Sequence, residues 1–295
     1  MPGEVGKRWI AGLTLGLAAL GLCLFDLWRG STWGVVIIGA FIALTAAAEY
    51  RLLVRPQADR LPLWLFLGGC VLLTLMGDPR LRAPVEAATG LPVTGLLLGA
   101  LLVALTIRHM VRWAGDGFTA NLGAAAFGLL WIAIPCHLLV ELGCRATPGR
   151  PTHGVQLVLL AIIACKLGDV FAFFGGRAFG RHKMCPRISP GKTWEGFACS
   201  LAGSLIGVWA FGALTGATWF VHSGPPFDAW WKLAVFALVV GPAGALGDLV
   251  ESCVKRSLAA KDSGAVVPGF GGILDVYDAI LIALPVAALV GPLLQ

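Results

Sequence analysis

The chain has 295 residues, of which 58% are hydrophobic and only 13% are charged, and its formal net charge is +6. A soluble globular domain usually carries about 25% charged residues, so a water-soluble fold of this size would lack the polar surface to cover itself. The composition therefore excludes an ordinary soluble protein and predicts a chain whose solvent is lipid.

Stretches of mostly apolar residues follow one another along the whole chain, each close to the length of about 20 residues that a membrane-spanning helix needs. They lie at about 9–28, 33–49, 61–77, 91–107, 122–143, 155–174, 197–219, 230–250 and 273–293. None shows the alternation of a barrel strand. We therefore expect an all-α fold, a polytopic integral membrane helical bundle with about nine transmembrane helices. The second and third stretches are short, which leaves a count of eight open.

The first stretch follows Lys7 and Arg8, as the apolar core of a signal peptide would. More spans follow at once and no small-residue cleavage site leads into a soluble domain, so we expect an uncleaved first helix. Alternate loops, beginning with the N-terminal segment, hold most of the Lys and Arg residues, the richest being 175–196 and 251–272. Cytoplasmic loops carry this excess. The pattern predicts a cytoplasmic N-terminus, with both rich loops on the cytoplasmic side. We expect the protein in a bacterial inner membrane with its active site facing the cytoplasm.

The residues that could carry chemistry crowd into the second half of the chain. Residues 1–150 hold apolar helices and short loops, and we expect them to be a scaffold, whereas residues 151–295 form the expected catalytic region. The eight cysteines form no CxxC pair and no Cys/His cluster with zinc spacing, so we expect them to be structural.

Two charges interrupt the stretch 155–174. Lys166 and Asp169 are three residues apart and share a helix face. Each charge costs about 2.5–3.5 kcal/mol at the centre of a span on insertion scales. We therefore expect them to line a polar cavity or to pair with each other. The following loop, 175–196, mixes cations with Gly and hydroxyl residues, which suits a polyanion such as a triphosphate.

Within that loop, residues 191–193 read Gly-Lys-Thr and resemble part of a P-loop. Pro186 occupies the place of the first P-loop Gly and no strand is expected before it, so we reject a P-loop. Ser189, Lys192 and Thr193 remain candidate phosphate ligands. Ser189 precedes a proline and could instead cap a helix.

A polar stripe ends the stretch 230–250, and its members are spaced i, i+3, i+4 and i+7: Asp248, Glu251, Ser252 and Lys255. Glu251 and Lys255 could form an ordinary i,i+4 ion pair worth a few tenths of a kcal/mol. Asp248 has no such local partner, which favours a functional role for it.

A glycine-rich turn, 268–272, leads into the last stretch, whose first turns carry Asp275 and Asp278. Glycine lets backbone approach a ligand closely, and the free amides of a helix N-terminus attract phosphate. Two carboxylates on one face of a lipid-buried helix repel each other unless a cation holds them, and Mg²⁺ is usually bound by one or two carboxylates plus substrate phosphates. Stabilisation by the helix N-terminus is the alternative, and it explains one Asp more easily than two. Carboxylates, cations and a glycine turn together predict metal-assisted phosphoryl or nucleotidyl transfer.

The last two clusters read Ser252-x-x-Lys255-Arg256-x-x-x-x-Lys261-Asp262-Ser263-Gly264, then Pro268-Gly269-x-Gly271-Gly272-Ile273-x-Asp275-x-x-Asp278. This pattern resembles the signature of phosphatidate cytidylyltransferases (CDP-diacylglycerol synthases), and residues 189–196 and 247–252 are similar to further hallmarks of that family. The resemblance covers about residues 150–295. It departs at two positions: Phe270 stands where the family usually has His, and Val276 where it usually has Arg.

The resemblance implies that CTP and phosphatidate are condensed to CDP-diacylglycerol and pyrophosphate in phospholipid biosynthesis, with Mg²⁺ and with K⁺ as a second ion. It implies that Asp248, Asp275 and Asp278 bind metal and act in catalysis together with Lys255. The implied substrate-binding residues are Ser189, Lys192, Thr193, Glu251, Ser252, Arg256, Lys261, Asp262, Gly271 and Gly272. The expected partners are CTP, phosphatidate and the lipid bilayer, without nucleic acid, and a homodimer is compatible with the sequence.

Other functions stay open at this point. The departures at positions 270 and 276 leave room for a CTP-dependent kinase of an isoprenoid alcohol or a cytidylyltransferase for another lipid phosphate. A CDP-alcohol phosphotransferase would need a denser Asp-Gly and Ala-Arg pattern upstream. A transporter would also place charges inside spans, but it would show matching repeats and broken helices in both halves.

Overall fold

The computed structural model describes residues 2–54, 62–111, 117–217, 226–258, 260 and 272–294, and for residues 2–13 it describes the backbone. The helices are α1 (Pro2–Arg29), α2 (Trp33–Val54), α3 (Leu63–Leu75), α4 (Pro79–Thr89), α5 (Val93–Val111), α6 (Phe118–Gly128), the π-helical turn η1 (Leu129–Ala133), α7 (Ile134–Gly143), α8 (His153–Phe179), α9 (Trp194–Ala217), α10 (Trp230–Ser257) and α11 (Leu274–Leu293). Strands β1 (Lys183–Cys185) and β2 (Ser189–Thr193) form an antiparallel hairpin. The nearly all-helical architecture confirms the predicted fold class, and the hairpin is the addition to it.

Seven helical segments within the described ranges are long and apolar enough to cross a membrane, or up to eight if a bent pair counts as one span. They are α2, α5, the continuous segment Phe118–Gly143, α8, α9, α10 and α11. Each of them overlaps one predicted stretch, and α1 overlaps the first stretch. The arrangement confirms a polytopic helical bundle.

The predicted stretch 61–77 takes a different form. Its helix α3 has 13 residues, and the chain then bends by 91° into α4. Such a helix rises about 20 Å, less than the hydrocarbon thickness of about 30 Å. The sequence explains the bend: Asp78 caps α4 by accepting the backbone N–H of Arg80, and Pro79 occupies the first position of the new helix.

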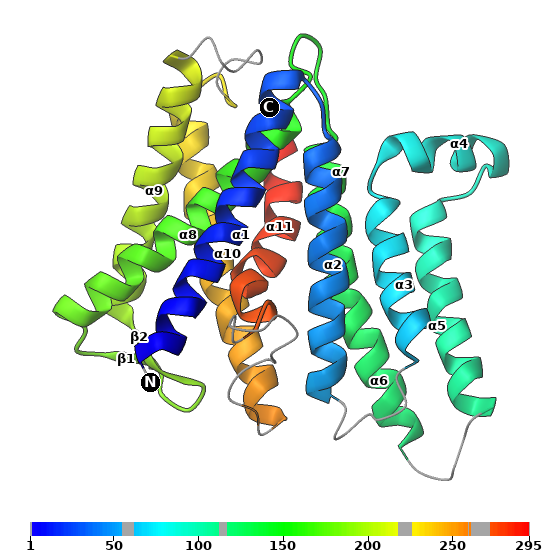
Figure 1. Ribbon diagram of the computed structural model, residues 1–295. Coiled ribbons are helices and arrows are strands. Elements are labelled where there is room, and N and C mark those ends of the chain that lie inside the picture. The colour runs from blue at the N-terminus through cyan, green and yellow to red at the C-terminus, as the bar shows by residue number, and fades with distance from the viewer. Residues whose placement is uncertain are drawn as a thin grey trace.

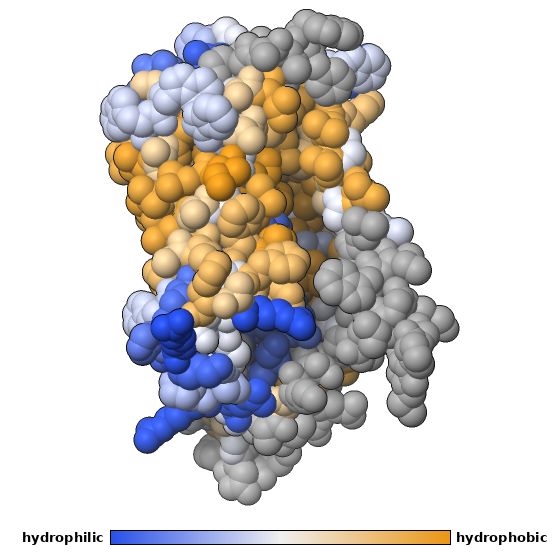
Figure 2. Space-filling view, turned by 90° about the vertical axis from the view of Figure 1, so that its left-hand side faces the viewer, coloured by the Kyte–Doolittle hydropathy of each residue, from blue (hydrophilic) through white to orange (hydrophobic). Residues whose placement is uncertain are grey.

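The segments that carry the predicted chemistry gather at one end of the bundle. In Figure 1 the N-terminus, the hairpin and the end of α10 all lie at the lower end, whereas α4 and the C-terminus lie at the upper end. Figure 2 shows a hydrophobic band between two more hydrophilic ends. Large apolar side chains of the helices, such as Trp209 of α9 and Leu289 of α11, are exposed. The chain therefore presents a membrane belt, and the predicted chemistry sits at a single membrane face.

The last four helices frame that chemistry. Helix α8 packs along α9, α10 packs along α11, and α10 also contacts α8 and α9. Glycines allow α8 and α9 to pack closely: a Cβ on Gly175 of α8 would collide with Cys199, and one on Gly203 of α9 would collide with Phe171. Small residues let helices approach in lipid, where packing contacts and hydrogen bonds drive association.

The first half of the chain also supports these helices. Helix α11 packs against α7 and touches α2, and one continuous apolar core contains residues of both halves. The division into a scaffold, 1–150, and a catalytic region, 151–295, stays a prediction.

Candidate functional site

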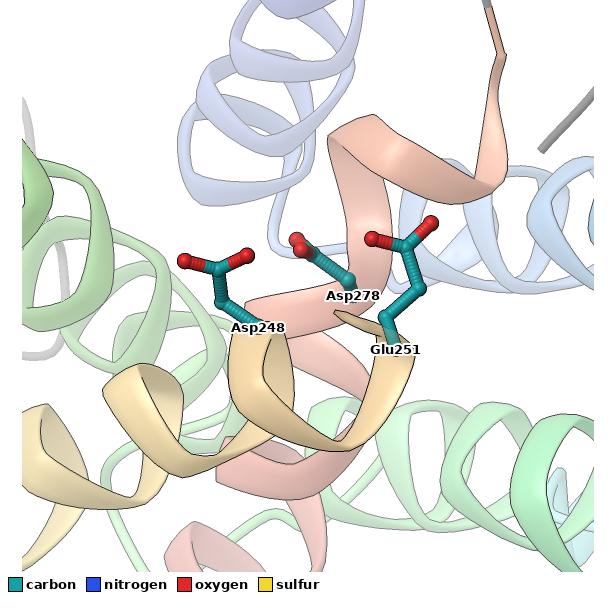
Figure 3. Close-up of side chains that lie close together, drawn as sticks. All are labelled: Asp248, Glu251 and Asp278. Carbon is teal, nitrogen blue, oxygen red and sulfur yellow. The ribbon is translucent and has the colours of Figure 1, made fainter. Parts of the chain in front are cut away.

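Three carboxylates from two neighbouring helices converge at the polar end of the bundle. Asp248 and Glu251 lie one turn apart on α10, and Figure 3 shows Asp278 of α11 between them. One oxygen of each carboxylate lies within 4.8 Å of the others, and the exposed fractions of Glu251 and Asp278 are only 1% and 6%. Two oxygens on one Mg²⁺ are at most about 4.2 Å apart at bond lengths of about 2.1 Å. The three carboxylates could therefore hold a divalent cation after a small adjustment.

Gly247 explains how α10 comes this close to α11. A Cβ at this position would collide with the carbonyl oxygen of Asp278 and would lie 2.9 Å from the Cα of Ala279. Because glycine has no Cβ, the backbone next to Asp248 can touch the backbone that carries Asp278.

We expect Gly247→Ala to lower the free energy of unfolding by about 1–3 kcal/mol, as overpacking of a close contact does. Thermal unfolding in detergent measures this loss. Gly99→Ala on α5 is the matched control, because nothing lies within 4 Å of a Cβ there. It should be neutral or stabilising by up to about 1 kcal/mol, the helix-interior cost of Gly relative to Ala. Equal melting temperatures for Gly247→Ala and wild type would contradict the close-approach explanation.

Lys255 joins α10 to α11 through two carboxylates. Its Nζ lies 2.8 Å from Oε2 of Glu251 and 2.8 Å from Oδ1 of Asp275. The predicted i,i+4 pair with Glu251 is thus confirmed, and Asp275 adds a partner from the next helix. Asp275, expected among the metal ligands, turns to Lys255, whereas Glu251, expected to bind substrate, lies with Asp248 and Asp278. The roles of both residues stay predictions.

A cavity of about 600 Å³ opens beside the carboxylates, between α8, the hairpin, α9, α10 and α11. Among the residues that the structure describes, its charged lining consists of four carboxylates and three cations, a formal charge of −1: Asp169, Asp248, Asp275, Asp278, Lys166, Arg177 and Lys192. Its apolar wall includes Phe173, 62% exposed, and Phe197. The cavity therefore offers both signs of charge next to apolar surface at the membrane boundary.

Lys192 reaches the cavity from the hairpin. Its Nζ lies 2.6 Å from Oδ2 of Asp248 and donates to the carbonyl of Ala245 at 3.0 Å. Glu195, in the first turn of α9, fixes the hairpin by accepting the backbone N–H of Arg181 at 3.1 Å and by pairing with the ring of His182 at 2.6 Å. The hairpin thus holds a cation directly over an acidic residue of α10.

The interpretation of Ser189 as a helix cap is wrong. Residues 189–193 pair with β1, and α9 begins only at Trp194. The cap is Thr193, whose hydroxyl oxygen accepts the N–H of Gly196 at 3.1 Å. Ser189 and Thr193 both line the cavity.

Lys166 and Asp169, the two charges inside α8, line the cavity. This agrees with the expectation that they face a polar cavity. Lys166 donates from Nζ to the carbonyl of Val276 at 3.0 Å, so its hydrogen bond goes to α11. Arg177 lines the cavity from the same helix; the sequence placed it among the cations of the segment 175–196 but not among the named site residues. The spacing of Lys166, Asp169 and Arg177 fits one helix face, so helical periodicity was the available signal.

The structure brings together six of the predicted site residues as lining of the cavity: Ser189, Lys192, Thr193, Asp248, Asp275 and Asp278. Five others within the described ranges do not line it: Glu251, Ser252, Lys255, Arg256 and Gly272. Lys261, Asp262 and Gly271 lie outside the described residues.

Comparisons with known proteins extend these observations to the whole chain. The model of the Cytidylyltransferase family matches residues 7–294. A phosphatidate cytidylyltransferase of Mycobacterium bovis is 30% identical over 275 residues, which cover 92% of this chain and 83% of the relative. Relatives with the same name from Staphylococcus saprophyticus (37% over 162 residues, 55% of this chain and 56% of the relative) and Brucella abortus (32% over 197 residues, 66% and 65%) match shorter parts. Because the family match runs through nearly every helix described above, the chain belongs to the cytidylyltransferase family.

Proposed function

We propose that this protein transfers the cytidylyl group of CTP to phosphatidate and forms CDP-diacylglycerol and pyrophosphate. The observation that carries the proposal is the convergence of Asp248, Glu251 and Asp278 beside a cavity that also contains cations. We take phosphatidate as the lipid substrate from the names of the relatives, which are phosphatidate cytidylyltransferases. We propose that the reaction takes place at the cytoplasmic face of a bacterial inner membrane, and the excess of Lys and Arg in the loops on that side supports the orientation.

The carboxylates fit Mg²⁺, which prefers hard oxygen ligands and binds few protein carboxylates. We assign Asp248, Glu251 and Asp278 as the ligands, because their oxygens lie within 4.8 Å of one another. Asp275 is linked to Glu251 through Lys255, whose ammonium group donates a hydrogen bond to each of the two carboxylates. It adds a fourth carboxylate to the cluster, and we propose K⁺ as a second ion there. Bound Mg²⁺ would neutralise charge on the triphosphate and polarise it.

The charge of the cavity supports an anionic substrate. Its described lining carries a formal charge of −1, and Glu251 and its partner Lys255 cancel each other, so one Mg²⁺ would change the total of these groups to +1. Lys166, Arg177 and Lys192 would then position phosphates, which are the part of CTP and phosphatidate that cations recognise. The exposed ring of Phe173 offers apolar surface to the acyl chains of the lipid. These chains would stay in the bilayer while the phosphate headgroup reaches the cations.

The reaction needs no protein nucleophile. A phosphate oxygen of the lipid attacks the α-phosphorus of CTP, and the bond from that phosphorus to the oxygen shared with the β-phosphorus breaks. Pyrophosphate leaves with the electron pair of that bond. The chain's contribution is to orient the two anions in line and to stabilise the charge of the transition state.

The direct test uses purified protein in detergent with phosphatidate, Mg²⁺ and CTP labelled at the α- or the γ-phosphorus. We expect the α-label in the lipid and the γ-label in pyrophosphate, with no transfer after chelation of Mg²⁺. A CTP-dependent kinase would instead put the γ-label into the lipid. Other lipid phosphates replace phosphatidate in the matched control. Preference for one of them would overturn the lipid substrate, and failure of every reaction would overturn the function.

A further inference from the structure

The first turn of α11 receives a buried carboxylate from the other half of the chain. Glu49, near the end of α2, is 0% exposed, and its Oε2 accepts the N–H of Leu274 at 2.7 Å. Leu274 is the first residue of α11 and precedes Asp275 directly. A scaffold helix thus contacts the backbone that carries two of the acidic residues of the site.

This contact does for α11 what a local cap does for other helices. The first backbone N–H groups of a helix have no partner within the helix, and Ile273, at the N-cap of α11, makes no side-chain capping bond. A carboxylate there gains a charge-assisted hydrogen bond and a favourable interaction with the helix dipole. Glu49 is not among the residues that line the cavity, so its route to the site is through the backbone of α11.

The same turn is held from the cavity side by a group of opposite charge. Lys166 of α8 donates to the carbonyl of Val276, two residues after the N–H that Glu49 binds. The apolar side chain of Val276 supplies no polar anchor of its own. The direction in which Asp275 and Asp278 leave the backbone therefore depends on contacts from α2 and α8.

We infer that Glu49 is a positioning residue: it holds the first turn of α11 so that Asp275 in this turn and Asp278 one turn later meet the carboxylates of α10. The inference rests on the proposed function for its consequence in catalysis. It differs from a general stabilising role because loss of Glu49 should alter cation binding and not stability alone.

Asp26 provides the matched control. It is also 0% exposed, and its Oδ2 accepts the N–H of Val35 in the first turn of α2 at 3.0 Å. The end of α1 and the start of α2, which this contact joins, lie at the upper end of Figure 1, away from the hairpin and the end of α10. Asp26→Ala and Glu49→Ala each remove a buried helix-capping carboxylate, so both should lower the melting temperature in detergent.

The deciding measurement is the rise in melting temperature on adding Mg²⁺ without CTP, because a cation that binds the folded state stabilises it by mass action. We expect Glu49→Ala to need about tenfold more Mg²⁺ for half of this rise, and Asp26→Ala to need the wild-type concentration. Glu49→Gln keeps an oxygen acceptor and should shift the midpoint about threefold, so it decides the question if Glu49→Ala does not fold. A wild-type Mg²⁺ midpoint in either folded Glu49 variant would overturn the inference. This measurement needs no turnover. Failure of the proposed reaction would therefore not affect the test of Glu49, and the two failures can be told apart.

Discussion

Asp278→Asn should lower cytidylyl transfer from CTP to phosphatidate at least a hundredfold, a loss of about 3 kcal/mol of transition-state stabilisation. Asp278 is 6% exposed and lies between Asp248 and Glu251 (Figure 3). The amide has nearly the shape of the carboxylate but lacks its charge, so the variant should fold while its acidic cluster binds a cation more weakly. Initial rates at several Mg²⁺ concentrations measure the loss and show how much of it added cation restores.

The control for this variant is Asp228→Asn. The Asp228 side chain is 67% exposed, and its bond at 2.7 Å goes to Lys232 at the start of α10, far along that helix from Asp248. The same chemical change there should leave turnover within twofold of wild type, because Asp228 lies far from the carboxylates and a surface ion pair contributes at most about 1 kcal/mol to stability. Wild-type turnover by Asp278→Asn would remove that residue from the catalytic set.

The sequence predicted those features whose signal is local. The lengths of the apolar stretches gave the spans, because every backbone group in lipid must be satisfied within a helix or a closed barrel. The i, i+3 spacing of Asp248 and Glu251 placed both on one face of α10, and the structure finds them in one cluster. The charges of Lys166 and Asp169 predicted a polar cavity within the bundle, and both residues line one.

The features that the sequence did not predict depend on contacts between distant residues. Residues 189–193 form a strand because β1 pairs with them, and a proline and a glycine within five residues gave no strand signal. The bond from Lys255 to Asp275 joins two helices, and the spacing of Asp275 to Asp278 does not indicate it. The bond from Glu49 to Leu274 joins positions 225 residues apart, which no periodicity indicates.

Lys255→Met should lower the free energy of unfolding by about 3–5 kcal/mol, the typical cost of removing one partner from a buried ion pair. The Lys255 ammonium bridges Glu251, whose side chain is 1% exposed, and Asp275, whose side chain is 29% exposed. Methionine keeps the length and the apolar stem of lysine, so the lost quantity is the charge and not the packing. Thermal and denaturant unfolding in detergent measure the change, and Lys232→Met is the control because its partner, Asp228, is exposed.

The cause of that loss can be separated by a second substitution. If it comes mainly from leaving the Glu251 carboxylate buried and unpaired, then adding Glu251→Gln to Lys255→Met should recover at least about 1 kcal/mol, because a neutral amide costs less to bury than a charge. If it comes from the lost link between α10 and α11 through Asp275, the double variant should be no more stable than Lys255→Met alone. Recovery would mean that the protein keeps a buried acid beside Asp248 and Asp278 at a cost that Lys255 offsets. Such a cost is expected of a group retained for cation binding and not for stability.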